Sequence, residues 1–163
     1  MTRIEALSQK LPDVSKAVEL VNKWQNEGQK VVFTNGCFDI LHLGHLHYLA
    51  AAADLGDKLV VGLNSDASVK RLKGESRPIN DIDTRTHMLA AIGYVNMVVV
   101  FEDDTPLDLI KALSPDILVK GGDWALDQIV GADHVKSRGG EVKTLKFLEG
   151  YSTTTIIARI KQD

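Results

Sequence analysis

Two histidines stand three residues apart, at the point where a β-branched run gives way to a helical pattern. His42 and His45 follow the run 31–34 and stand at the entry to an Ala/Leu-rich helix that we expect over residues 45–56. At a helix entry both imidazoles can share one face, beside the positive end of the helix dipole. A phosphate oxygen that gains negative charge would meet two N–H donors there. The spacing therefore predicts a phosphate site, and Gly44 lets a nucleotide approach the backbone.

A second candidate anion site lies near the end of the chain. Ser152, Thr153 and Thr154 precede an Ile-rich stretch that predicts a helix over residues 152–161. Hydroxyls and free amides at a helix start can hold phosphate oxygens, although the same residues are more often only a helix cap. Beside the histidine pair, we favour the phosphate site over the plain cap.

Five short runs rich in β-branched residues predict the strands that must position these groups. They are continuous apolar runs, which is typical of strands buried on both faces. The predicted strands are 31–34, 58–63, 97–101, 117–119 and 141–145, and the predicted helices are 13–25, 45–56, 84–95, 105–113 and 152–161. Strands that alternate with helices predict an α/β fold, a Rossmann-like, doubly wound, five-stranded parallel sheet with helices on both faces. Ligands bind such a sheet beyond the carboxyl ends of its strands.

The domain organisation follows from the absence of repeats and of Pro/Gly-rich linkers. We expect a single domain over residues 1–163, with residues 1–29 as an N-terminal helical extension packed on it. The polar stretch 70–83 lacks periodicity and predicts either a functional loop or lid, or an ordinary mobile connection. The sequence does not separate these two interpretations.

Composition argues against several classes of function. The 163 residues carry a formal net charge of -3, and nucleic-acid binding needs a clustered basic surface, so we expect no nucleic-acid partner. No apolar stretch approaches the roughly 20 residues of a membrane span, so we expect no membrane partner. The charged N-terminus lacks the apolar run of a signal peptide, and Cys37 is the only cysteine. We therefore expect a cytoplasmic protein.

Other chemistry fits the sequence less well. A zinc site would need a third ligand at a characteristic spacing, and none is evident, so we predict no protein-held metal. Cys37 as a nucleophile would need a nearby base, and we favour a packed strand-end residue instead. Asp39 is interpreted as a cap of the following turn. The remaining histidines are interpreted as surface or packing residues: His47, His87 and His134.

The run 36–45, Gly-Cys-Phe-Asp-Ile-Leu-His-Leu-Gly-His, resembles the signature of the HxGH nucleotidyltransferase superfamily. The resemblance extends over nearly the whole chain from Lys30 onward. Within the superfamily, the chain looks most like the bacterial D-glycero-β-D-manno-heptose 1-phosphate adenylyltransferases, and next like the glycerol-3-phosphate cytidylyltransferases. Three further segments support the resemblance: 62–66 facing the substrate, 120–124 as a base-binding turn, and 149–154 as a second phosphate motif.

The resemblance implies a role for individual residues. It gives catalytic roles to His42, His45, Lys73 and Arg85, and substrate-binding roles to Asn64, Asp66 and Arg77. It gives nucleotide-binding roles to Thr34, Asn35, Gly36, Cys37, Phe38, Asp39, Gly44, Gly121, Asp123, Ser152, Thr153 and Thr154. The side chains of Lys73, Arg77 and Arg85 could equally be solvated surface charges, which is the commoner fate of Lys and Arg.

The resemblance also implies a reaction. AMP would pass from ATP to D-glycero-β-D-manno-heptose 1-phosphate, giving ADP-heptose and pyrophosphate for lipopolysaccharide or a related glycan. The acceptor phosphate is already anionic near neutral pH, since its second pKa is about 6, so no general base is needed. Mg²⁺ would arrive with ATP and be held mainly by phosphates. The resemblance further implies a homodimer and a separate heptose kinase upstream.

One position departs from the pattern of the cytidylyltransferases. They usually carry an arginine five residues before the Ser-Thr-Thr run, where this chain has Phe147, and Lys146 could substitute in part. The departure favours the heptose branch. A CTP-dependent glycerol-3-phosphate cytidylyltransferase stays open as the nearest alternative, followed by a coenzyme-forming adenylyltransferase. A non-catalytic nucleotide-binding module ranks lowest, since both histidines are present.

Overall fold

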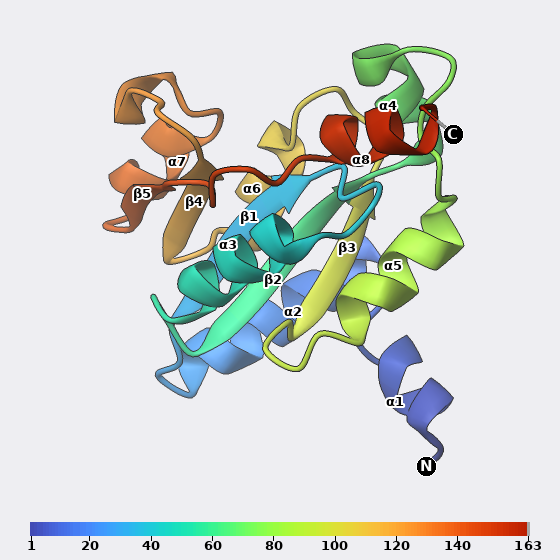
Figure 1. Cartoon of the computed structure of the whole chain (residues 1–163). Coiled ribbons are helices and arrows are strands. Elements are labelled where there is room, and N and C mark those ends of the chain that lie inside the picture. Colours follow the sequence, from blue (N-terminus) through green and yellow to red (C-terminus); the bar gives the residue numbers. More distant parts are fainter. Residues whose placement is uncertain (163) are drawn as a thin grey trace.

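Five parallel strands form one sheet in the computed structural model, which describes residues 1–162 (Figure 1). The strands are β1 (Val31–Gly36), β2 (Lys58–Asn64), β3 (Met97–Phe101), β4 (Ile117–Gly121) and β5 (Glu141–Leu145). They lie side by side in the order β3-β2-β1-β4-β5, so each strand predicted from the sequence is found and the predicted Rossmann-like sheet is confirmed. The strand order reverses between β1 and β4, where such sheets open a crevice for ligands.

Helices cover both faces of the sheet. One face packs against α2 (Val14–Asn26), α6 (Leu107–Leu113) and α7 (Ala132–Ser137), and the other against α3 (Leu43–Ala53) and α5 (Ile82–Ala90) (Figure 1). Phe33 and Leu118 lie in the first core, whereas Val32 and Val119 lie in the second. Successive strand residues therefore alternate between the two cores, as the pleat requires.

The remaining elements lie at the ends and edges of the sheet. They are α1 (Arg3–Ser8), α4 (Asp66–Lys73), the short 3-10 helix η1 (Leu126–Gln128) and α8 (Thr153–Ile160). In Figure 1, α8 crosses above the carboxyl ends of the central strands, near α4. No helix within residues 1–162 has the length and apolar character needed to cross a membrane.

The prediction of an unstructured stretch over residues 70–83 was wrong at both ends. Helix α4 continues to Lys73, and α5 begins at Ile82, which leaves only 74–81 as a connection. The helix α4 forms because Ser65 caps it, accepting from the Ser68 amide, and because Val69 is fully buried. Helix α5 ends at Ala90, five residues before the predicted end.

The N-terminal residues are joined closely to the sheet. Ala17 and Val21 of α2 are fully buried in the first core. The Lys10 ammonium donates to the carbonyls of Ala90 and Val95, at 2.9 and 2.8 Å. Helix α2 therefore supplies part of the core itself, and the Lys10 segment holds the end of α5 in place.

Candidate active site

The loop that follows β1 carries an unfavourable backbone conformation. Phe38 has a φ of 44°, in the left-handed region that a bulky side chain rarely adopts. Its ring is 7% exposed and meets the His45 ring edge-on, with 5.2 Å between the ring centroids. Such strain costs on the order of 1–3 kcal/mol and clusters at functional sites. The turn at Phe38 thus directs the chain into α3 with its ring packed against His45.

The two histidines stack at the N-terminus of α3. Their ring centroids are 3.8 Å apart and the planes differ by 20°. His42 is the N-cap, and its Nδ1 accepts a hydrogen bond from the His45 amide at 3.3 Å. Because Nδ1 is the acceptor, the proton of a neutral His42 ring is assigned to Nε2, which becomes a donor for an anion. A Cβ at Gly44 would lie 2.9 Å from His42 Cε1, so any other residue here would clash with the His42 ring in its present position.

Both imidazoles are poised in the neutral form. Burial lowers the pKa of His42, and burial together with the neighbouring His42 lowers the pKa of His45 to about 4. The buried Nδ1 of His45 has no hydrogen-bond partner among the side chains and backbone of residues 1–162. A buried polar atom without a partner is unfavourable, and an arriving ligand or water would relieve it. An anion bound here would also raise both pKa values.

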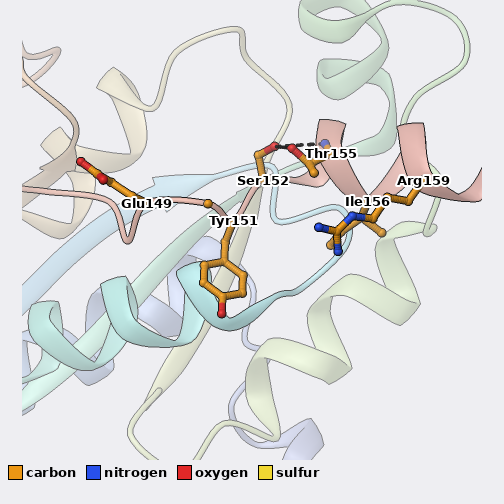
Figure 2. A pocket seen from close by; sticks show the side chains of 7 residues that line it. Glu149, Tyr151, Ser152, Thr155, Ile156 and Arg159 are labelled. Atoms are coloured by element: carbon orange, nitrogen blue, oxygen red, sulfur yellow. Dashed lines mark hydrogen bonds between the residues drawn. The ribbon is translucent and has the colours of Figure 1, made fainter.

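Helix α8 brings a second helix N-terminus to the same place (Figure 2). Ser152 is its N-cap, accepting from the Thr155 amide at 3.0 Å, and Thr153 Oγ1 donates to the carbonyl of Ile40 at 3.3 Å. The Tyr151 ring lies roughly parallel to the His42 ring, with centroids 6.5 Å apart. A hollow of about 370 Å³, lined by Glu149, Tyr151, Ile156 and Arg159 among others, adjoins this turn (Figure 2). The start of α8 is therefore tied directly to the histidine loop.

A cavity of about 730 Å³ opens at the carboxyl ends of the strands. Most of the residues predicted for the site line it: Asn35, Gly36, Cys37, Phe38, Asp39, His42, His45, Asn64, Lys73, Arg77, Gly121, Ser152, Thr153 and Thr154. Five predicted residues are not in its lining: Thr34, Gly44, Asp66, Arg85 and Asp123. Thr34 is fully buried and shares a 2.6 Å hydrogen bond with the Tyr48 hydroxyl, so it supports the wall from behind.

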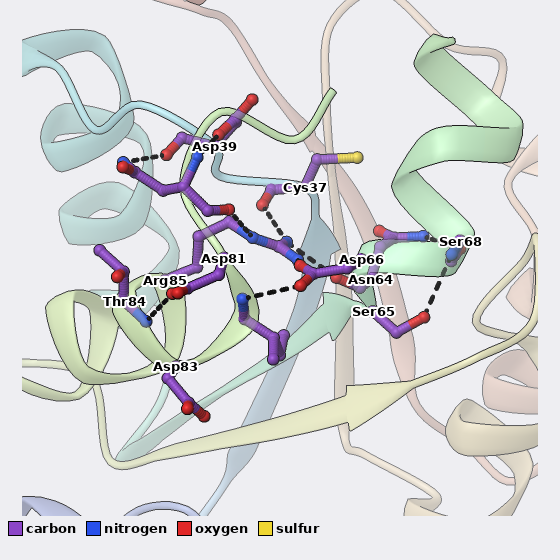
Figure 3. A network of polar contacts seen from close by, with 12 residues as sticks. Cys37, Asp39, Asn64, Ser65, Asp66, Ser68, Asp81, Asp83, Thr84 and Arg85 are labelled. Atoms are coloured by element: carbon purple, nitrogen blue, oxygen red, sulfur yellow. Dashed lines mark hydrogen bonds and ion pairs between the residues drawn. The ribbon is translucent and has the colours of Figure 1, made fainter. Parts of the chain in front are cut away.

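Arg85 requires the largest correction. We expected it to neutralise phosphate, but its side chain is buried behind the cavity (Figure 3). The guanidinium donates to the carbonyls of Cys37, Asn64 and Asn80, and to the Asp66 carboxylate at 2.6 Å. Each of these groups belongs to a different segment. Arg85 therefore joins the ends of β1 and β2 to α4 and the 74–81 connection. Asp66 is its partner, and the substrate-binding role expected of this half-exposed carboxylate stays a prediction.

Asp39 organises the 74–81 connection from the histidine loop. Its buried carboxylate accepts from the amides of Ile79 and Asn80 and from Arg77 Nε, the last at 2.6 Å. Burial alone would raise the pKa of Asp39, but the bonds from Asn80, Ile79 and Arg77 lower it. The carboxylate is thus ionised and fully engaged, and it holds Arg77 at the cavity wall.

Several aromatic and cationic wall residues were missed by the assignment of site residues. They are Tyr48, Lys120, Trp124, Phe147 and Tyr151. A Cβ at Gly121 would stand 2.4 Å from the Phe147 ring, so this glycine admits the ring that replaces the expected arginine. Lys120 and Trp124 lie in the segment that resembles a base-binding turn, which was the one signal that could have identified them.

Covalent and metal chemistry gain no support from the geometry. Burial raises the pKa of the Cys37 thiol, which keeps it protonated and poorly nucleophilic at neutral pH. Within residues 1–162, no group of three His, Cys, Asp or Glu side chains is arranged to hold a metal ion.

Comparison with known proteins agrees with this site. Residues 33–159 match the family described as cytidylyltransferase-like. The chain is 57% identical to the bifunctional protein HldE of Campylobacter concisus, over 93% of this chain and 31% of that protein. It is 56% identical to the bifunctional protein HldE of Vibrio cholerae, over 88% of this chain and 30% of that protein. The chain thus spans about 30% of the length of these relatives.

Two solved structures are similar in fold. The lipopolysaccharide core biosynthesis protein from Thermoplasma volcanium GSS1 has a TM-score of 0.61 and 31% identity, covering 77% of this chain and all of that one. The pantoate-beta-alanine ligase from Francisella tularensis has a TM-score of 0.59 at 14% identity, covering 93% of this chain and 76% of that one, and so shows the fold alone. With the family match spanning most of the chain, these relationships establish that the chain belongs to the cytidylyltransferase-like family of nucleotidyltransferases.

Proposed function

We propose that the chain transfers AMP from ATP to D-glycero-β-D-manno-heptose 1-phosphate, releasing pyrophosphate and giving ADP-heptose for lipopolysaccharide or a related glycan. The observation that carries the proposal is the stacked histidine pair, which lines a large cavity beside the start of α8. The motif resemblance to heptose 1-phosphate adenylyltransferases supports the acceptor. The similarity to HldE proteins and to a lipopolysaccharide core biosynthesis protein supports the pathway.

The proposed mechanism relies on alignment and charge stabilisation. The acceptor phosphate is an anion near neutral pH and attacks the α-phosphorus of ATP directly, so the P–O bond to the acceptor forms as the bond to pyrophosphate breaks. His42 Nε2 donates to an oxygen of the α-phosphate as its charge increases, and His45 stands beside it. The free amides at the start of α8, with Ser152 and Thr153, hold the outer phosphates.

Mg²⁺ enters this proposal only as part of the substrate. The residues of the cavity wall do not form a metal site, because Asp39 is fully engaged and Asp104 pairs with Arg71 at 2.8 Å. We propose that the ion arrives on ATP, bound to phosphate oxygens and water. The homodimer and the upstream heptose kinase, expected from the resemblance, are likewise proposals. Sedimentation velocity tests the dimer.

A matrix of nucleoside triphosphates against phosphorylated acceptors, read by pyrophosphate release, tests the proposal. We expect ATP with D-glycero-β-D-manno-heptose 1-phosphate to be the best pair. Preference for CTP with glycerol 3-phosphate would instead assign the chain to the cytidylyltransferases. Pyrophosphate release that is absent from every pair would overturn the proposed function.

A further inference from the structure

The cavity has two sides, which are set by the pleat of the central strands. Phe33 of β1 and Leu118 of β4 are register partners and lie in the core beneath α2 and α6. Two residues further along each strand, Asn35 and Lys120 must point to that same side. Both line the cavity. The histidine side is the opposite one, because α3 packs on the other core.

Lys120 is a half-buried cation without a counterion. Within residues 1–162 its ammonium has neither a salt bridge nor a hydrogen-bond partner, and Nζ lies over the Trp124 ring, 5.5 Å from the ring centroid. Burial is the main cause that lowers the pKa of Lys120, and the positive charge of Lys73 lowers it further. Lys73 and Lys120 therefore line the same cavity, and the two carboxylates in its lining, Asp39 and Asp104, pair with Arg77 and Arg71 instead. A bound anion would offset both the burial of the Lys120 charge and its repulsion by Lys73.

The reaction brings together two anions that repel each other. One anion can bind on the histidine side, where the N-termini of α3 and α8 and the two imidazoles come together. These groups suit a triphosphate tail. Lys120 lies across the strand ends from them, at the first position of the segment 120–124 that resembles a base-binding turn. The base would contact the rest of that turn, so the charge of Lys120 is available for the second anion.

We propose that Lys120 binds the phosphate of the acceptor and thereby selects a phosphorylated sugar on the α2–α6 side of the cavity. The inference rests on the proposed function, since it assumes that the second substrate carries a phosphate. Lys73 assists from the end of α4. The Trp124 ring lies beside the ammonium at a cation–π distance, which favours the charged form that would bind phosphate.

The Lys120→Met variant keeps the aliphatic stem and removes only the charge. We expect its KM for the heptose 1-phosphate to rise roughly ten- to a hundredfold, as for a lost charge-assisted hydrogen bond, while the KM for ATP changes less than about twofold. Lys120→Arg should restore part of the loss, which a merely structural role would not predict. Lys111→Met, at an exposed position on α6, is the matched control and should behave like the wild type. A rise in the KM for ATP, or no change in either KM, overturns the assignment.

A second measurement separates this inference from the proposed function. Acetylation of Lys120 by an N-hydroxysuccinimide ester, followed by mass spectrometry, reports occupancy without turnover. We expect heptose, glucose or mannose 1-phosphate to slow the acetylation of Lys120 at least fivefold, whereas ATP alone leaves its rate within a factor of two. If no substrate pair gives pyrophosphate, the proposed function fails, but selective protection by a sugar 1-phosphate still supports the Lys120 site. Protection by ATP alone, or by none of these compounds, overturns it.

Discussion

At the scale of single residues, the site depends on histidines that stay neutral. His42 has two tasks, because its Nδ1 caps α3 while its Nε2–H is left for a ligand. A proton on Nδ1 would break the cap, so the fold itself favours the neutral ring. His45 is more deeply placed, between the His42 and Phe38 rings. These contacts, and not proximity alone, distinguish the pair from the other histidines.

The two tasks of His42 can be separated by substitution. We predict that His42→Ala and His45→Ala each lower kcat by on the order of a hundredfold. His42→Ala should also lose about 1 kcal/mol of unfolding free energy with the cap, whereas His42→Asn retains a capping oxygen and loses only activity. Steady-state kinetics and urea unfolding provide the measurements. Near-normal kcat in both alanine variants would refute the catalytic role of the pair.

The lowered pKa of His45 also predicts a pH-dependent stability. Unfolded His45 takes up a proton near pH 6.5, whereas the folded ring does so only at about pH 4, so protons favour the unfolded chain between these values. Stability should therefore fall as the pH drops from 6.5 to 4, by at most roughly 3 kcal/mol from this residue. Urea unfolding across this range gives the slope, and His45→Gln should flatten it. An equal slope in the variant would show that other groups are responsible.

At the scale of elements, Arg85 determines how the segments around the cavity meet. Its guanidinium contacts the carbonyls of three segments and the Asp66 carboxylate. No pattern in the sequence predicts this, because carbonyl partners have no side-chain signature and lie up to 48 residues away. The β-branched runs, by contrast, predicted every strand. Helix α4 was missed because it is mostly polar, and only Val69 and Ser68 are buried in it.

Loss of Arg85 should therefore act through stability. We predict that Arg85→Met lowers the free energy of unfolding by about 3–5 kcal/mol, since it leaves a buried network without its donor. Arg71→Met removes a half-exposed ion pair with Asp104 and should cost less than about 1 kcal/mol. Urea unfolding compares the two variants. A fully stable Arg85→Met protein with reduced kcat would restore the role in catalysis first expected from the sequence.

Helix α8, unlike Arg85, should contribute little to stability, since none of its residues is buried. Its fraying is then a local event with little effect on global stability. We predict that Ser152→Ala and Thr153→Ala raise the KM for ATP several-fold, while the midpoint of urea unfolding hardly changes. Thr155→Val, whose hydroxyl shares a hydrogen bond with Ser152, serves as a nearby comparison. A KM for ATP that stays at the wild-type value in both alanine variants would argue against a phosphate site at α8.

At the scale of the whole molecule, the negative net charge does not reflect the positive charge of the cavity. The chain has a net charge of -3, yet Lys73, Arg77 and Lys120 all line one cavity. Lys120 lies at the carboxyl end of β4, whereas Lys73 and Arg77 lie on the chain that follows the carboxyl end of β2. The parallel sheet brings these segments to the same edge, although they are distant in sequence. Motif positions predicted the histidine and α8 sides of the cavity. The aromatic wall could not be predicted, because Tyr48, Phe147 and Tyr151 meet only after folding.

The phosphate cradle at the histidine pair is the central claim, and side-chain NMR tests it most directly. Imidazole resonances would be followed during titration with a non-hydrolysable ATP analogue, with His47, His87 and His134 as internal controls. We predict that His42 and His45 shift together and that their pKa values rise, while the three controls stay in place. Saturable binding of the analogue that leaves the His42 and His45 resonances unmoved would contradict the account.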